Sequence, residues 1–224
     1  MEDFLCQLSV CIEHGKINAQ SPHPPDMKGL DGAIELTQSC LNNNIKPKDI
    51  LEKGLLTGMQ NVGEKFRDRK IFIPEVLIAA KAMNVSMELL KPYFTSGEIK
   101  HKGKIVLGTV AGDLHDIGKN IVKMIVEGGG WQVIDLGVNV SAEQFIESIK
   151  ENNSKLVGLS ALLTTTMLNM ESIVRKVKEQ LDDVSVIIGG APVTEDFARQ
   201  INADAYFADP QKMLDYINDK HYTN

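Results

Sequence analysis

The sequence predicts an α/β protein with an N-terminal four-helix bundle and a C-terminal Rossmann-like, doubly wound parallel sheet of five strands. Two observations lead to this fold class. Residues 1–92 carry helical periodicity and no convincing strand, whereas from Lys104 onward short apolar runs alternate with helical segments. The polar stretch from Tyr93 to Gly103 has no periodicity and separates them. We therefore expect a helical cap domain over 1–92, a linker over 93–103 and a Rossmann-like domain over 104–224.

Four helices are expected in the first part of the chain. Apolar residues recur at helical spacing in each of them, and the cluster Ser21–Pro25 ends the first because proline cannot donate to a helix ladder. Two further prolines stand at first-turn positions, where a missing N–H has no cost. Short links between such helices are typical of an antiparallel bundle. The expected helices are Leu5–Ile17, Leu30–Leu41, Pro47–Phe66 and Pro74–Pro92.

The second part alternates strands with helices. This rhythm indicates a parallel sheet wrapped on both faces, and Gly128–Gly130 is typical of a helix end that turns into a strand. The expected strands are Ile105–Val110, Gln132–Asp135, Leu156–Leu159, Ser185–Ile188 and Ala205–Phe207. The helices expected between and after them are Lys119–Glu127, Ala142–Asn152, Thr166–Leu181, Thr194–Ile201 and Pro210–Asn218.

Composition excludes several classes of function. The net charge of −6 argues against a nucleic-acid partner, which would need clustered Lys and Arg. The longest apolar runs have the length of strands, so no membrane span or membrane partner is expected. The first residues lack the basic start and cleavage site of a signal peptide, and the three cysteines fit no zinc spacing. We expect a cytoplasmic protein with reduced thiols.

The loop Gly112–Gly118 follows the first strand of the sheet, at the edge where open α/β sheets bind ligands. It is not a P-loop, because five residues separate its glycines and Asn120 follows Lys119. The sequence has no G-x-G-x-x-G after this strand either, and a receiver domain would need an aspartate where Ser160 ends the third strand. Nucleotide-binding and receiver functions are therefore disfavoured.

His115 and Asp116 suggest two further interpretations. A hydrolase metal dyad would need more ligands, and the remaining histidines lie in segments that suggest no such site: His14, His23, His101 and His221. A single loop histidine is most simply explained by hydrogen bonds to its neighbours. His115 does not stand alone, however, because two more motifs end predicted strands.

These motifs form a three-part pattern with fixed spacing. Asp-x-His-x-x-Gly, from Asp113 to Gly118, is followed after 41 residues by Ser-x-Leu at Ser160–Leu162 and after 26 more by Gly189-Gly190. Each part ends a predicted strand, and the carboxyl ends of these strands line one crevice. The pattern resembles that of cobalamin-binding domains in methionine synthase, corrinoid methyl carriers and certain mutases.

The chemistry of this family accounts for the residue types. A neutral imidazole is a good cobalt ligand, and its other nitrogen needs an acceptor such as Asp113. We expect Ser160 to hydrogen-bond Asp113 and complete a His–Asp–Ser relay. The resemblance implies that His115 displaces the dimethylbenzimidazole of the cofactor, whose tail then passes the small glycines and meets Thr164 and Thr165. The implied cofactor-binding residues are Gly112, Asp113, Leu114, His115, Asp116, Ile117, Gly118, Ser160, Leu162, Thr164, Thr165, Gly189, Gly190 and Ala208, with His115 as the metal ligand.

The helical part distinguishes among the cobalamin families. Gly58–Phe66 and Ile71–Met83 resemble the four-helix cap of methionine synthase and of corrinoid proteins, whereas mutases carry a barrel there. The resemblance covers residues 28–224 and implies that one helical face covers the methyl side of the corrin. Its cofactor-binding residues would be Glu64, Phe72, Glu75 and Met83, although composition alone favours Met83 as part of the bundle core.

The resemblance predicts a corrinoid methyl-carrier protein. A donor-specific methyltransferase would methylate cob(I)alamin to methylcobalamin, and a second methyltransferase would pass the methyl group to an acceptor such as tetrahydrofolate or a thiol. A reductive activator is a further expected partner, and the linker is the expected hinge. We expect no complete active site in this chain itself. The alternative is a cobalamin-binding sensor, which usually carries an additional DNA-binding or output module. The sequence does not indicate the methyl donor.

Overall fold

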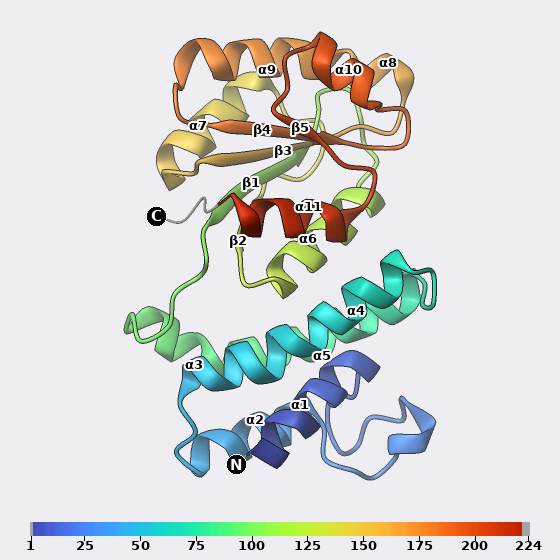
Figure 1. Ribbon diagram of the computed structural model, residues 1–224, viewed down its shortest axis with the longest axis vertical. Helices are drawn as coiled ribbons and strands as arrows, with labels where there is room; N and C mark the ends of the chain where they lie inside the picture. The colour runs from blue at the N-terminus through green and yellow to red at the C-terminus, as the bar shows by residue number, and fades with distance from the viewer. Residues whose placement is uncertain (1, 221–224) are drawn as a thin grey trace. The chain divides into compact units, whose positions relative to one another are not determined.

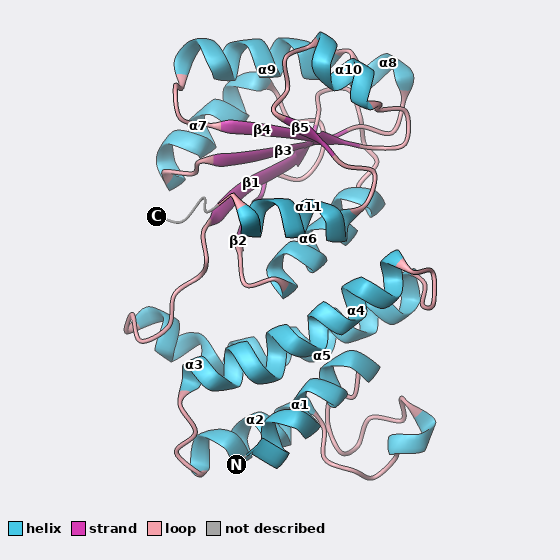
Figure 2. Ribbon diagram, in the orientation of Figure 1, coloured by secondary structure: helices cyan, strands magenta, loops and turns pink. Residues whose placement is uncertain are grey.

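The computed structural model describes residues 2–220, which form two compact units (Figure 1). The first unit runs to Lys100 and includes Gly128–Gly130, and the second comprises the rest of the chain from His101. The first unit is helical and the second is an α/β sheet (Figure 2). The predicted fold class is confirmed. His221, one of the histidines considered above, lies outside the described residues.

The helical unit contains the four expected helices, one of them in three segments. They are α1 (Glu2–His14), α2 (Ala33–Asn42), α3–η2–α4 (Pro47–Asp49, Ile50–Leu56 and Thr57–Arg67) and α5 (Ile73–Thr95). The segment η2 is a π-helical turn, and the residues on both sides of it keep right-handed helical dihedrals, so the chain does not break. α1 packs against α2, α4 and α5, and its buried Leu8 and Ile12 belong to the bundle core.

The connection from α1 to α2 is longer than a tight helical turn. α1 ends at His14 because Gly15 adopts a positive φ of 69°, and a short 3₁₀ turn, η1 (Pro25–Met27), follows. Glu35 holds the connection in place. Its Oε1 accepts the Ala19 N–H at 3.1 Å and its Oε2 accepts the Gly32 N–H at 3.0 Å.

α5 extends beyond its predicted end. It was expected to stop at Pro92, but it continues to Thr95, so Tyr93, Phe94 and Thr95 are helical and do not belong to an irregular linker. A proline inside a helix removes one N–H donor, here the one that would bond to the carbonyl of Glu88. Glu88 and Pro92 are both exposed, so water can solvate that carbonyl.

The sheet of the second unit has five parallel strands in the order β2-β1-β3-β4-β5. They are β1 (Lys104–Thr109), β2 (Gln132–Asp135), β3 (Leu156–Ser160), β4 (Ser185–Gly189) and β5 (Ala205–Tyr206), each within a residue of its predicted bounds. This order places the topological switch point between β1 and β3, where such sheets bind their ligands.

Helices cover both faces of the sheet (Figures 1 and 2). α6 (Ile117–Gly128) and α11 (Pro210–Asp219) cover one face, and α7 (Ala142–Asn152), α9 (Asn169–Gln180) and α10 (Glu195–Gln200) cover the other. Val106, Val157 and Val186 point to the second face and form its core with Phe145 of α7. The helix predicted over Thr166–Leu181 is instead two helices, α8 (Thr164–Met167) and α9.

Three neighbouring strands end in register. Thr109 of β1 pairs with Ser160 of β3, and Ser160 pairs with Gly189 of β4. The loops that follow these residues therefore meet at one edge of the sheet. No helix in the part of the chain from residue 2 to 220 is long and apolar enough to cross a membrane.

Candidate functional site

The loop between β1 and α6, residues 111–116, carries the candidate site; we call it the His loop. It begins with a turn in which the Asp113 N–H donates to the Val110 carbonyl at 3.1 Å, and Gly112 adopts a positive φ of 81°. Glycine is favoured there because a side chain would be strained. Further along, the Thr109 hydroxyl donates to the His115 carbonyl at 3.0 Å. Both ends of the loop are thus tied to the end of β1.

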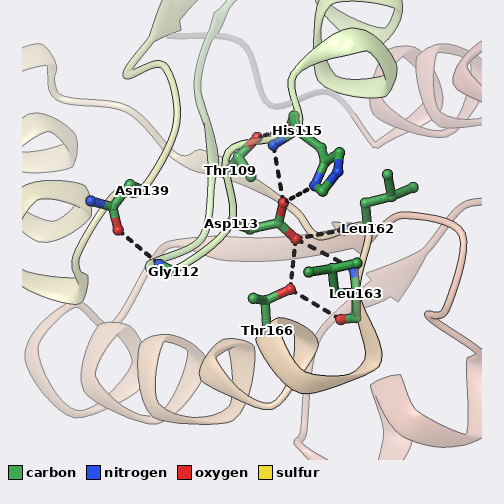
Figure 3. Close-up of polar contacts among 8 residues, drawn as sticks. All are labelled: Thr109, Gly112, Asp113, His115, Asn139, Leu162, Leu163 and Thr166. Carbon is green, nitrogen blue, oxygen red and sulfur yellow. Dashed lines mark hydrogen bonds and ion pairs between the residues drawn. The ribbon is translucent and has the colours of Figure 1, made fainter.

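Asp113 is the centre of the site. Its side chain is completely buried, and both of its oxygens accept hydrogen bonds (Figure 3). Oδ1 lies 2.7 Å from Nδ1 of His115 and accepts the His115 backbone N–H at 3.0 Å. Oδ2 accepts the Leu162 N–H at 2.8 Å and the Thr166 hydroxyl at 2.6 Å. Asp113 therefore links the loop after β1 to the loop after β3 across the switch point.

These donors keep the carboxyl group of Asp113 ionised. Burial alone would raise its pKa, but the hydrogen bonds from Thr166, Leu162 and His115 outweigh burial and hold the pKa of Asp113 far below its usual range. An ionised carboxylate can only accept hydrogen bonds, so Nδ1 of His115 must carry the proton. In the neutral ring the lone pair then lies on Nε2.

The ring of His115 presents this Nε2 outward. The His115 side chain is 51% exposed, and no hydrogen bond to Nε2 is present among residues 2–220. Large apolar side chains close to His115 in the sequence, or in the loop after β3 that binds Asp113, are exposed: Leu114 (72%) and Ile117 (67%), and Leu162 (45%) and Leu163 (44%). Exposed apolar side chains that gather in one place mark a binding surface. The arrangement offers a single nitrogen ligand surrounded by apolar groups.

Comparisons with known proteins identify the family. Two family models, each described as a B12 binding domain, match residues 30–91 and 103–213. Trimethylamine corrinoid protein 1 of Methanosarcina acetivorans is 43% identical over 178 residues, which cover 78% of this chain and 82% of that protein. The chain belongs to the corrinoid-protein family.

Further relatives of this corrinoid-family chain agree with that assignment. Dimethylamine corrinoid protein 1 of M. acetivorans is 44% identical over 165 residues, which cover 72% of this chain and 78% of that protein. The methanol:cobalamin methyltransferase complex MtaBC of Methanosarcina barkeri contains a chain of similar structure, with a TM-score of 0.83 and 26% identity. That match covers 98% of this chain and 80% of the other. These relatives give no support to the sensor alternative.

One predicted contact of the corrinoid-family site is wrong. Ser160 was expected to hydrogen-bond Asp113, but within the described residues Thr166 occupies that position (Figure 3). Successive side chains of a strand point to opposite faces. Leu159 points to the core under α7 and α9, so Ser160 points to the face covered by α6 and α11. Thr166 reaches Asp113 because it lies on the short helix α8 that follows the β3 loop.

Two asparagines were also missed by the sequence analysis. The Asn139 side-chain oxygen accepts the Gly112 N–H at 2.7 Å, and the Asn169 amide donates to the Ala111 carbonyl at 2.7 Å. Asn139, between β2 and α7, and Asn169, the first residue of α9, both support the His loop from elsewhere in the same unit. The Thr-rich run after Leu163 was a usable signal, but it pointed to Thr164 and Thr165, which are exposed, and not to the buried Thr166.

The glycines of the corrinoid-family pattern differ in their surroundings. A Cβ at Gly118 would meet nothing within 4 Å, whereas one at Gly189 would lie 2.9 Å from the Phe207 carbonyl oxygen. Gly190 has a φ of 131°, and a Cβ there would lie 1.9 Å from the Ala161 carbonyl oxygen. The close approach of two loops therefore already requires glycine at position 190. Ala208, after β5, is exposed.

The predicted cofactor contacts of the helical unit lie on α4 and α5. Phe72 is 66% exposed, and its N–H donates to Oε2 of Glu75 at 3.1 Å at the start of α5. Glu64 is half-buried and accepts a hydrogen bond from the Gln60 amide at 3.2 Å. Met83 is buried, as composition alone favoured. Whether these four side chains bind a cofactor stays a prediction of the family resemblance.

A protein-built metal cluster is not part of this corrinoid-family site. Residues 2–220 contain no group of three or more His, Cys, Asp or Glu side chains that could hold a metal ion. Asp116 accepts a hydrogen bond from the Asn120 amide at 3.0 Å, at the start of α6. A lone imidazole suits a metal that brings its remaining ligands with it, as cobalt does in a corrin.

Proposed function

We propose that this chain binds cobalamin through His115 and carries a methyl group between two methyltransferases. The observation that supports this most directly is the state of His115: Nδ1 is held by a buried carboxylate and Nε2 is free at the switch point of the sheet. A ring oriented in this way is an effective metal ligand, because the partner of its other nitrogen fixes the tautomer and raises its basicity.

The residues present fit such a cofactor. The exposed Leu114, Ile117 and Leu162 suit a broad apolar ring. On the face covered by α6 and α11, the in-register pair Ser160 and Gly189 carries little bulk at the ends of β3 and β4. Gln211, at the start of α11, is 4% exposed, and its Oε1 is a buried acceptor without a partner among the described residues. An unpaired buried acceptor costs about 1–3 kcal/mol, which a donor from a ligand would recover.

Each part of the site has a proposed role. Nε2 of His115 would hold the cobalt, while Asp113, with Thr166, keeps the proton on Nδ1. When bound, the cobalamin supplies a cobalt centre that accepts and releases a methyl group. The exposed Leu114 and Leu162 would exclude water from the bound corrin ring. The remaining proposed contacts are Gly112, Asp116, Gly118, Ser160, Thr164, Thr165, Gly190 and Ala208, with Glu64, Phe72, Glu75 and Met83 on the helices.

We further propose the class of methyl donor and the partners. Relatives that are 43% and 44% identical are named for trimethylamine and dimethylamine, which supports a methylated amine as the donor. The similar chain in the methanol:cobalamin methyltransferase complex supports a donor-specific methyltransferase as one partner. An acceptor methyltransferase and a reductive activator complete the proposed system. Specificity for the donor would then lie in the first methyltransferase.

The substitution His115→Ala tests the proposed role of His115 as the cobalt ligand. We expect it to weaken binding of aquacobalamin at least about tenfold, the lower end of the effect of disturbing groups around a metal ligand. The visible spectrum of the complex should also lose its imidazole-bound form. His23→Ala is the control, because His23 is exposed in the helical unit and should change neither quantity. An unchanged spectrum in His115→Ala would contradict the proposed function.

A further inference from the structure

Asn139 lies in the segment between β2 and α7 and makes two contacts with the His loop. Its side-chain Oδ1 accepts the Gly112 N–H at 2.7 Å (Figure 3), and its own N–H donates to the Asp113 carbonyl at 3.0 Å. The backbone of Asn139 has a positive φ of 56°, which few residues other than glycine adopt and which asparagine tolerates. Asn139 therefore fixes Gly112 and Asp113 from one side.

The same segment also holds the end of β1, just before the His loop. The Thr109 N–H donates to the Gly137 carbonyl at 3.0 Å, and the Val140 N–H donates to the Thr109 carbonyl at 2.9 Å. At the start of the segment, Oδ1 of Asp135 lies 2.7 Å from Nζ of the buried Lys119, in the first turn of α6. The end of β2 and the segment after it thus support the chain before and after His115, and none of these hydrogen bonds involves the imidazole.

Asp113 connects Asn139 to His115. Asn139 holds the backbone of Asp113, and the carboxylate of Asp113 holds the imidazole. A rotation of the backbone between Gly112 and Asp113 would displace the carboxylate, which is 2.7 Å from Nδ1 of His115. The two asparagine contacts oppose that rotation.

We propose that Asn139 is a positioning residue for the metal-ligating His115. It holds Asp113 where the carboxylate orients the imidazole, and so it strengthens coordination through Nε2 without contacting the cofactor. This inference rests on the proposed function, in which His115 binds cobalt. Groups that orient a ligand from outside the metal's own coordination sphere commonly change metal affinity.

Three substitutions separate the side-chain contact from the backbone conformation. Asn139→Gly removes the acceptor for the Gly112 N–H and leaves the positive φ unstrained. Asn139→Asp keeps an oxygen at the same place. Asn153→Gly is the matched control, because Asn153 also has a positive φ, of 49°, but caps the C-terminal end of α7.

The first readout is the dissociation constant for aquacobalamin at one fixed pH, with the imidazole-bound fraction read from the visible spectrum. We expect Asn139→Gly to bind about fivefold more weakly, the effect of one lost hydrogen bond. Asn139→Asp and Asn153→Gly should stay close to the unsubstituted chain. In the cofactor-free protein, hydrogen exchange at the Gly112 amide should be faster in Asn139→Gly alone. Equal weakening in Asn139→Asp, which retains the acceptor, would overturn the inference.

A double-mutant cycle with His115→Ala gives the decisive result. If Asn139 acts through His115, Asn139→Gly has no further effect on affinity once the imidazole is absent. Independent, additive effects would overturn the inference. If His115→Ala weakens binding but Asn139→Gly does not, the positioning role fails and the proposed function stands. If His115→Ala itself leaves affinity and spectrum unchanged, the proposed function fails first.

Discussion

At the scale of single residues, Thr166 is the side chain that completes the hydrogen bonds around Asp113. Its hydroxyl lies 2.6 Å from Oδ2, and both residues are buried. A hydrogen bond to a buried charged group is stronger than one between neutral groups, because the charge has no access to water. Thr166 therefore helps to keep Asp113 ionised and His115 in a single tautomer.

The substitution Thr166→Val tests this contact. Valine has nearly the same shape as threonine, so the main change is the lost donor, and we expect the free energy of unfolding to fall by about 1.5–3 kcal/mol. Urea unfolding of the cofactor-free chain measures it. Ser160→Ala is the matched comparison and should cost less, because Ser160 points away from Asp113. If Ser160→Ala lowered the free energy of unfolding more than Thr166→Val does, the originally expected His–Asp–Ser relay would be favoured instead.

Asp113 and His115 could be predicted from the sequence because they are two positions apart, and local spacing is visible in a sequence. Thr166 reaches the site from α8, and Asn139 reaches it from the segment between β2 and α7. Their roles depend on the direction in which each loop leaves its strand, which no local pattern specifies. Ser160 was assigned to Asp113 because it ends the neighbouring strand; the alternation of side chains along β3 was the physical reason that it points elsewhere.

At the scale of elements, Lys119 and Asp135 join the first turn of α6 to the end of β2. The Lys119 side chain is 2% exposed, and Nζ lies 2.7 Å from Oδ1 of Asp135. Burial alone would raise the pKa of Asp135, but the hydrogen bonds from Lys119 and the Gly137 N–H lower it. A buried ion pair is costly to break, because removing one partner leaves the other charge unpaired.

The pH dependence of this pair follows from the lowered pKa. Such a carboxylate stabilises the fold above its unfolded pKa of about 3.9, and this stabilisation is lost as the pH falls through the lower folded value. We expect Asp135→Asn to be less stable than the unsubstituted chain by about 2 kcal/mol at neutral pH. The difference should shrink below about pH 4.

Urea unfolding at a series of pH values measures this difference. Asp182→Asn is the control, since Asp182 is exposed and its substitution should change the free energy of unfolding little at any pH. A destabilisation of Asp135→Asn that is the same at pH 7 and pH 3 would show that the charge of Asp135 is not its source.

Most elements could be predicted because hydrophobic periodicity reports them directly. All five strands and the four bundle helices were found in this way. The errors lie where hydrogen bonds depart from the periodic pattern. The π turn in Ile50–Leu56 does not interrupt the spacing of apolar residues. The helices α8 and α9 meet at Leu168, which keeps helical dihedrals. Pro92 is tolerated inside α5. The first two features leave no mark on the residue types, and Pro92 is a helix-ending signal that does not end this helix.

At the scale of the whole molecule, the chain has two compact units. The change of period at Lys104 predicted a division near this place, because a bundle and a parallel sheet need different apolar patterns. We propose that the units are independent folding domains. The single tryptophan, Trp131, reports on one of them: it belongs to the α/β unit, and its indole N–H donates to Asn218 of α11 at 3.0 Å.

This proposal predicts two unfolding transitions. Tryptophan fluorescence should follow the α/β unit alone, and far-ultraviolet circular dichroism should follow the helices of both units, so their urea midpoints should differ. Aquacobalamin at about 100 times its dissociation constant should stabilise the fluorescence transition by about 2.7 kcal/mol if it binds the folded state only. Coincident transitions for both signals would contradict independent domains.

The exposed apolar side chains beside His115 affect how the chain behaves in solution before it binds a cofactor. Leu114, Ile117, Leu162 and Leu163 present apolar surface to the solvent. Surface of this kind promotes self-association. If cobalamin covers this surface, the loaded chain should self-associate less than the empty chain, and light scattering at rising protein concentration measures the difference.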